Sequence, residues 1–338
     1  MKRIVGLLLV AIVVAIAAGA AWIVMGVSRP YKGYAGEEQF VEIPQGAGPL
    51  SIGRRLVDAG VIRDTLVFRY ELARTGTGKR LQAGEYRFDR PMAVKEVVAA
   101  IAHGDVYLRP ITFREGLTAR QMAELFESKG FGAATEFVAA ASNGSLVRAI
   151  DPAASDLEGY LFPDTHALPR RTTAAQLVAR MVGGFEKVLT PDLRARAEAR
   201  GLSVRELVTL ASIVEKETGK PEERSLVAAV YSNRLKIGMG LQCDPTVIYA
   251  LERAGRYTGN LTREDLRFDS PYNTYRYAGL PPGPIANPGR ASLEAAANPA
   301  DVPYLYFVSR NDGSHAFAST LDEHNHNVFE FQIKPNRR

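Results

Sequence analysis

The hydrophobic pattern of the chain begins with one long apolar segment. From Ile4 to Ser28 no residue carries a charge, whereas Arg3 and Arg29 flank the segment. About 20 apolar residues in a helix span the hydrocarbon core of a bilayer, and the apolar core of a cleaved signal peptide is only about 7–15 residues long. Ala18-Gly19-Ala20 offers a small-residue exit for cleavage, but apolar residues continue beyond it. We therefore predict a retained transmembrane anchor over residues 4–28.

The residues around this segment predict its orientation. Lys2 and Arg3 on one side are balanced by Arg29 and Lys32 on the other, so the flanking charges differ little. The free amino terminus and the early position of the segment favour an N-terminus that stays in the cytoplasm. Residues 1–3 then form a cytoplasmic tip, and the chain beyond residue 30 is exported. We predict a single-pass protein of the inner membrane, with its body in the periplasm or cell wall space.

Two segments after the anchor share one pattern, a β-rich run that ends at a glycine and continues into an amphipathic helix. They cover residues 41–61 and 111–131, and each helix closes at a second glycine, as helix C-termini often do. Apolar residues within them follow the i, i+4 spacing of one helix face: Ile52 and Leu56 in the first copy, Met122 and Phe126 in the second. We predict a small α+β module over residues 38–110, and a second copy with its connection over residues 111–156.

Residues 157–333 have the pattern of a larger α+β domain. Helical periodicity predicts helices over residues 174–189, 191–200, 204–218, 222–235 and 291–297. Residues 279–289 are rich in proline and glycine, which excludes regular helix and central strand and predicts a shaped loop. An apolar strand over residues 304–309 leads into the turn Asn311-Asp312-Gly313. The predicted fold class of the whole chain is α+β.

The helix over residues 204–218 holds a candidate acid. Ser203 and Glu206 match a capping box at its start, and the apolar stripe includes Glu215 inside its arc, with Glu217 on the other shoulder. A carboxyl group on an apolar face costs several kcal/mol to keep charged, so its pKa is expected to rise. A general acid needs such a raised pKa at neutral pH. The helical wheel does not decide between Glu215 and Glu217.

Other polar residues stand in aromatic or constrained settings that suit a sugar ligand. Rings can stack on the apolar faces of sugars, while amides and acids bond to sugar hydroxyl groups. The candidate contacts on this criterion are Glu158, Tyr160, Asp164, Gln242, Tyr272, Asn273, Tyr275 and His315.

The composition is that of a folded globular protein. Hydrophobic residues make up 46% and charged residues 23% of the chain, and 42 Lys and Arg against 37 Asp and Glu give a formal charge of +5. Because these charges are spread along the chain, a dedicated nucleic-acid binder is not expected. The single cysteine, Cys243, excludes a disulfide within the chain. His315, His324 and His326 lack the spacing of metal ligands, so we predict no metal site.

Five motifs follow one another along the second half of the chain: YLFPDT at residues 160–165, ASIVEKET at 211–218, NRL at 233–235, LQCDPTV at 241–247 and YNTY at 272–275. With residues 279–289, 304–308 and 323–325, they make the sequence resemble the endolytic murein transglycosylases (the YceG-like, MltG family). The resemblance covers nearly the whole chain. His166 departs from it, because a tyrosine is expected after the Asp-Thr pair.

The resemblance implies cleavage of the bond between N-acetylmuramic acid (MurNAc) and N-acetylglucosamine (GlcNAc) within nascent peptidoglycan strands. It implies that Glu215 is the catalytic acid and base of a lyase, that the N-terminal module is LysM-like, and that no cofactor takes part. The product is a 1,6-anhydroMurNAc end. Implied partners are the glycan strands, the inner membrane and the peptidoglycan synthases of elongation or division.

Two other functions remain open from the residues. The first is a muramidase that uses water, with Glu215 as acid and Glu217, Glu158 or Asp164 as second carboxylate. The second is a peptidoglycan-binding scaffold without catalytic activity.

Overall fold

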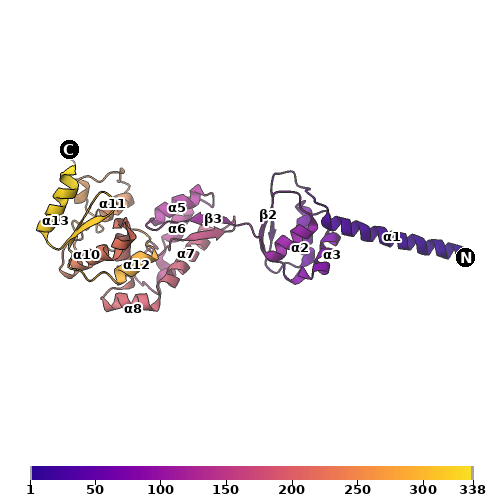
Figure 1. Ribbon diagram of the computed structural model, residues 1–338, viewed down its shortest axis with the longest axis horizontal. Coiled ribbons are helices and arrows are strands. Elements are labelled where there is room, and N and C mark those ends of the chain that lie inside the picture. Colours follow the sequence, from indigo (N-terminus) through magenta and orange to yellow (C-terminus); the bar gives the residue numbers. More distant parts are fainter. Residues whose placement is uncertain (1, 336–338) are drawn as a thin grey trace. The chain divides into compact units, whose positions relative to one another are not determined.

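The computed structural model describes residues 2–335, so Met1 of the expected cytoplasmic tip lies outside the described residues. The chain divides into two compact units. Unit 1 contains the chain up to Pro110 together with Ala167–Arg171, and unit 2 contains Ile111–His166 and the chain from Thr172. Helices and short strands occur in both units, which confirms the α+β class (Figure 1).

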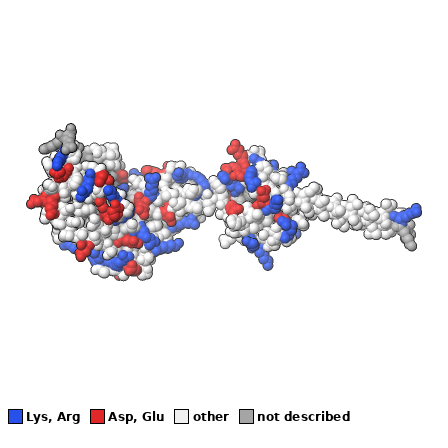
Figure 2. Space-filling model, viewed as in Figure 1, with Lys and Arg blue, Asp and Glu red and all other residues white. Residues whose placement is uncertain are grey.

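Unit 1 begins with a single apolar helix, α1 (Lys2–Ser28). The helix is long and apolar enough to cross a membrane, and the apolar stretch of it is not buried in the protein. Its surface is free of charge beyond Arg3 (Figure 2). Only its last turns are packed, where Val27 is 6% exposed in the core of unit 1. The predicted N-terminal apolar helix is confirmed.

The rest of unit 1 is a two-stranded sheet with three helices. The strands pair antiparallel with Val41 opposite Tyr86, and Ile52 and Leu56 are buried as the helical spacing predicted. The elements are β1 (Gln39–Ile43), α2 (Pro49–Asp58), α3 (Thr65–Thr75), β2 (Gly84–Phe88) and α4 (Val94–His103). Both α3 and α4 contact the end of α1.

Residues 111–156, expected as a second copy and a connection, fold as part of unit 2. The second copy does form a strand and a helix, with Met122 and Phe126 buried. Its helices are tied to the chain that follows, because α6 packs on α7 and the N–H of Leu157 donates to the carbonyl of Ala141 at 2.8 Å. The elements are β3 (Arg109–Thr112), which pairs with β4 (Thr165–Leu168), α5 (Ala119–Ser128), α6 (Ala134–Ala141) and α7 (Ala174–Val188).

The centre of unit 2 is the helix α9 (Val204–Glu217), in which every residue from Leu207 to Val214 is buried. Helices α8, α10, α11 and α12 pack around it, and α10 and α12 lie beside one another (Figure 1). The surrounding elements are α8 (Pro191–Ala199), α10 (Arg224–Lys236), α11 (Asp244–Arg253), α12 (Arg290–Ala297), β5 (Tyr306–Ser309), β6 (His315–Ala318) and α13 (Leu321–Val328). Asn311 and Gly313 adopt positive φ between β5 and β6, which confirms the predicted turn.

Candidate active site

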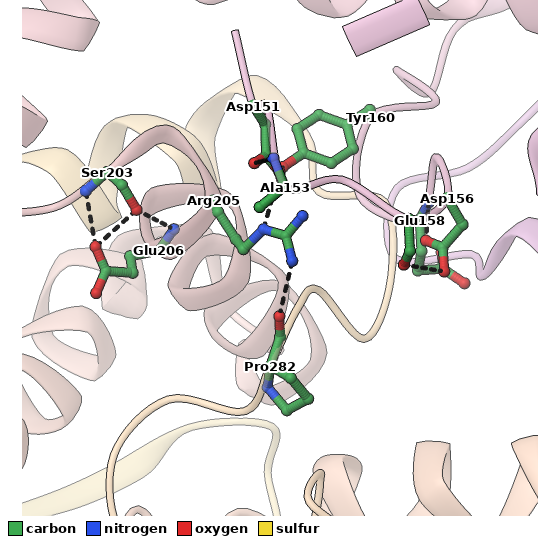
Figure 3. Close-up of polar contacts among 10 residues, drawn as sticks. Asp151, Ala153, Asp156, Glu158, Tyr160, Ser203, Arg205, Glu206 and Pro282 are labelled. Carbon is green, nitrogen blue, oxygen red and sulfur yellow. Dashed lines mark hydrogen bonds and ion pairs between the residues drawn. The ribbon is translucent and has the colours of Figure 1, made fainter. Parts of the chain in front are cut away.

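Helix α9 starts where the capping box predicted and ends with two carboxyl groups. Ser203 accepts a hydrogen bond from the N–H of Glu206, and the Glu206 carboxylate accepts one from the N–H of Ser203 (Figure 3). At the other end, Glu215 and Glu217 lie in the last turn. Residues two apart on a helix point in different directions, so the two carboxyl groups have different neighbours.

The Glu215 carboxyl group is buried among polar groups. Its side chain is 7% exposed, its Oε2 accepts a hydrogen bond from the N–H of Gly289 at 3.0 Å, and its Oε1 lies 3.7 Å from Nη2 of Arg224. Gly289 is the N-cap residue of α12, and a carboxylate at a helix N-terminus is favourable. The expected apolar setting is therefore corrected: the stripe of α9 is apolar, but the carboxyl group extends past it to Gly289 and Arg224.

A third carboxyl group, Glu115, reaches the same place from the loop before α5. Its Oε2 lies 3.8 Å from Nη2 of Arg224. A Cβ at position 289 would meet the Glu115 carboxyl group, so this side chain lies close against the backbone of Gly289. Burial and the Glu215 charge raise the pKa of Glu115. Sequence reasoning missed Glu115 and Arg224. One signal in the sequence could have found Glu115: the two copies of the repeat differ at this position, with Gln45 in the first copy and Glu115 in the second.

The Glu217 carboxyl group is bonded to uncharged donors, whereas Glu215 faces the Arg224 guanidinium. Its Oε1 accepts one hydrogen bond from the Tyr231 hydroxyl and another from the Cys243 thiol, each at 3.1 Å. Burial raises the pKa of Glu217, the nearby Asp244 raises it further, and the two donors and His315 oppose that shift. A carboxyl group with a raised pKa holds its proton at higher pH, as a general acid must.

Three of the predicted sugar contacts belong to the surroundings of Glu217. Gln242 is exposed and its N–H donates to the carbonyl of Thr274 at 3.2 Å, which brings it beside Tyr275. The Tyr275 hydroxyl donates to Oδ1 of Asp244 at 2.6 Å, and the side chain is 37% exposed. The Glu217 charge contributes to a raised pKa of Tyr275, so the two groups interact electrostatically.

His315 reaches Glu217 from the hairpin of β5 and β6. Its Nδ1 lies 2.7 Å from Oε2 of Glu223, whose Oε1 accepts the backbone N–H of His315 at 3.0 Å. The imidazole packs edge-on against Phe307, which packs edge-on against the Tyr231 ring. Glu223 therefore fixes the imidazole in the neighbourhood of the Tyr231 and Glu217 pair.

Glu158 supports the fold from a buried position. Both of its oxygens accept the N–H of Ala119 at the start of α5, and Oε1 also accepts Nδ2 of Asn287 at 2.8 Å. Tyr249 donates to Oε2 at 3.3 Å. Burial raises the pKa of Glu158 to about 7, against the effect of these donors. The residue lines a cavity of about 270 Å³ with Arg253.

Tyr160 also has a structural environment. It is 2% exposed, and its hydroxyl donates to Oδ2 of Asp151 at 2.5 Å. The same Asp151 oxygen accepts from Nε of Arg205, which donates in turn to the carbonyl of Pro282 (Figure 3). Asp151 thus links the tyrosine to Arg205 at the start of α9, and Arg205 in turn links α9 to the proline-rich loop.

The remaining predicted contacts lie in three different settings. Tyr272 is half-buried, with its ring 5.0 Å from that of Tyr249. Asn273 is fully buried, and its amide bonds to backbone groups of its own loop, at Leu266, Phe268 and Tyr275. Asp164 is exposed, and its side chain accepts the N–H of Thr165. Of these, Asn273 shapes the loop from inside the protein.

A comparison of the sequence with known families matches the region that holds this site. The model of the YceG-like family matches residues 41–330, which include all of α9 and its surroundings. The chain belongs to the YceG-like family. Both carboxyl groups of the last turn of α9 lie within the family match.

Relatives in the YceG-like family carry a functional name. An endolytic murein transglycosylase of Bacillus subtilis (strain 168) is 32% identical over 300 residues, which cover 84% of this chain and 82% of the relative. One of Streptococcus pneumoniae (serotype 2, strain D39) is 31% identical over 320 residues, which cover 86% of this chain and 58% of that relative. The predicted resemblance is confirmed, and so is the expectation of an enzyme of the lyase class.

A solved structure of the YceG-like family has the same fold. The crystal structure of a YceG-like protein from Listeria monocytogenes superposes with a TM-score of 0.59 at 32% sequence identity, over 86% of this chain and 98% of that one.

The raised pKa of Glu158 makes stability depend on pH. A glutamate in the unfolded chain titrates near about 4.3, so between that pH and about 7 the folded state binds the proton more tightly. The contribution of Glu158 to the free energy of unfolding is therefore complete below the unfolded pKa. It is lost as pH rises through 7, and the loss is roughly 3 kcal/mol. Urea unfolding between pH 5 and 8 measures this loss. Glu158→Gln should lack this dependence and exposed Glu124→Gln should retain it; parallel curves for all three proteins would contradict the assignment.

Proposed function

We propose that the chain is an endolytic peptidoglycan lytic transglycosylase. It cleaves the MurNAc–GlcNAc glycosidic bond of nascent glycan strands and leaves a 1,6-anhydroMurNAc end. Family membership and the names of the relatives support the reaction class. The observation that carries the chemistry is the half-buried Glu217 at the end of α9, whose carboxyl group has a raised pKa and lies next to exposed polar and aromatic side chains.

We propose Glu217 as the acid in place of Glu215, the residue that the resemblance implies. Glu217 has the raised pKa and adjoins the surroundings of Gln242, Tyr275 and His315. Glu215 accepts a hydrogen bond from the N–H of Gly289 and faces Arg224, so its side chain is engaged in holding the start of α12. We therefore assign proton transfer to Glu217 and a positioning role to Glu215, and test the two assignments together.

The proposed reaction needs one carboxyl group and no cofactor. Protonated Glu217 gives its proton to the glycosidic oxygen as the bond to C1 of the muramoyl residue breaks. The carboxylate then takes the proton of the muramoyl C6 hydroxyl, whose oxygen attacks C1 and closes the anhydro ring. Since the nucleophile belongs to the substrate, no second carboxylate has to activate water, unlike in ordinary glycoside hydrolysis. The acid–base step contributes about 10²–10⁴-fold, and positioning of the sugar supplies more.

Sugar binding is assigned to the predicted residues that surround Glu217, of which Gln242 and Tyr275 are exposed and His315 is half-buried. We assign contacts with the glycan to Gln242, Tyr275 and His315, and a more distant contact to Tyr272. Glu158, Tyr160 and Asn273 hold the surrounding elements instead, because their polar atoms bond within the protein.

Two matched variants of α9 test which carboxyl group is catalytic. Glu217→Gln should lower strand cleavage of purified peptidoglycan at least 100-fold, because an amide cannot give up the proton. Glu215→Gln, the same change two residues away, should leave measurable cleavage with the same product. Mass spectrometry of the muropeptides gives both rate and product, and thermal unfolding checks the fold of each variant. The opposite ranking would return the catalytic role to Glu215.

The same products decide between the competing functions. An anhydro end identifies a transglycosylase, and a reducing end that takes up ¹⁸O from solvent identifies a hydrolase. If purified wild-type protein does not cleave, it acts as a binding scaffold and the proposed function is wrong. Cleavage that is unchanged in both variants would instead show that neither carboxyl group is the acid.

Position 243 offers a test of how the acid is tuned. In the proposed mechanism activity falls at alkaline pH when Glu217 loses its proton. A hydroxyl donates a stronger hydrogen bond than a thiol, so Cys243→Ser should lower the pKa of Glu217 and move the alkaline limb of the pH–rate profile to lower pH. Cys243→Ala removes the donor and should move it to higher pH, each by about 0.5–1 pH unit. Equal losses at every pH, without movement of the limb, would contradict this role.

The N-terminal module is proposed to be LysM-like and to grip glycan. A strand and amphipathic helix, repeated in the chain, support a binding module. Deletion of residues 38–110 with retention of α1 should weaken sedimentation with purified peptidoglycan several-fold while the type of product stays the same. Undiminished sedimentation of a folded deletion variant would contradict glycan binding by the module.

We propose that α1 anchors the protein in the inner membrane with the N-terminus in the cytoplasm and both units outside. The length, apolar character and exposure of α1 support this assignment. Anchoring would restrict cleavage to strands near the bilayer, where the peptidoglycan synthases are the expected partners.

A further inference from the structure

A cavity of about 430 Å³ lies in unit 1 at the point where α1 meets the folded part of the unit. Most of its wall is apolar and comes from three elements, with Trp22 and Met25 on α1, Val67 on α3 and Val94 at the start of α4. Trp22 and Met25 are 52% and 62% exposed, so the wall on the α1 side is open. The cavity is therefore a partly open apolar recess beside the apolar helix.

Polar side chains close one end of this recess. Arg29 and Arg63 line it together with Asp64 and Tyr31. The Asp64 carboxylate accepts the N–H of Leu66 and caps α3, whereas the Arg63 guanidinium stacks on the Tyr31 ring at 4.6 Å. The cations exceed the acids at this end, so the recess combines an apolar wall with a net positive rim.

If α1 spans a bilayer, this rim would lie at the depth of the lipid headgroups. Arg29 is the first charged residue after the apolar segment, and a tryptophan near the end of a spanning helix sits at the membrane interface. Leu66, on the first turn of α3, is 57% exposed, which continues the apolar surface from α1 onto unit 1. If α1 spans the bilayer, the recess opens into the outer layer of lipid.

We infer that this recess binds one anionic phospholipid, with an acyl chain against Trp22, Met25 and Val67 and the phosphate at Arg29 and Arg63. The inference rests on the proposed membrane anchoring. A bound lipid would fill the space between α1 and α3 and hold unit 1 at a fixed height above the bilayer. Selectivity for anionic over zwitterionic lipid should be about fivefold, as expected for one net cation at the surface.

Trp22 is the only tryptophan of the chain, so its fluorescence reports on this recess. The full-length protein is placed in phosphatidylcholine vesicles that contain a minority of brominated lipid, since bromine quenches tryptophan on contact. Brominated phosphatidylglycerol should quench Trp22 as if enriched about fivefold over its share of the bilayer, and brominated phosphatidylcholine only in proportion to its share. Free phosphate added to the vesicles should not reverse the difference, because the acyl chain contributes to binding.

Charge variants separate a specific lipid from general attraction. The single variant Arg63→Gln and the double variant Arg29→Gln/Arg63→Gln should lose the enrichment. Quenching by brominated phosphatidylglycerol should then be close to the level expected from its share of the bilayer. Arg54→Gln removes the same charge from an exposed position on α2 that does not line the recess, and should leave the enrichment unchanged. Equal quenching by both lipids in the wild type, or equal loss in all variants, overturns the inference. If no brominated lipid quenches Trp22, the anchoring itself is wrong, which is a different result.

Discussion

The site depends on keeping one carboxyl group of α9 out of water while leaving it close to the surface. Glu217 ends a helix whose preceding two turns are buried, so its position is set by the packing of α9 rather than by a loop. Desolvation disfavours its charged form, and two modest donors, a phenol and a thiol, limit that effect. The net effect raises the pKa of Glu217, in the direction that the proposed role as an acid requires. Surroundings of strong cationic donors would abolish that property.

Glu215, the other carboxyl group in the last turn of α9, has surroundings of the opposite kind. Glu215 meets a backbone amide, the N-terminus of α12 and the Arg224 guanidinium. These groups stabilise negative charge. Glu115 joins the same guanidinium from the loop before α5, so this cluster ties three separate segments of unit 2 together. Two glutamates separated by a single lysine thus have different surroundings because α9 directs them to different neighbours.

Unit 1 connects the apolar helix α1 to the folded part of the chain. Its core is continuous with the end of α1, through Val27, so the apolar helix and the folded module are one body. A membrane-spanning α1 would therefore present the module directly at the lipid surface. The recess between α1 and α3 lies at that boundary, where an apolar wall and arginine side chains meet.

Sequence alone determined the features that depend on local spacing. The apolar segment, the capping box at Ser203, the strand and helix of each repeat copy and the turn at Asn311 follow from the order of neighbouring residues, and all are found in the structure. The motifs also identified the family. What sequence could not provide was the surroundings of each side chain. The apolar stripe suggested Glu215, but Arg224, Gly289 and Glu115 approach it from distant segments, and Tyr231 and Cys243 approach Glu217 in the same way. Only tertiary packing decides desolvation and hydrogen bonding, and these two effects decide which carboxyl group can act as an acid.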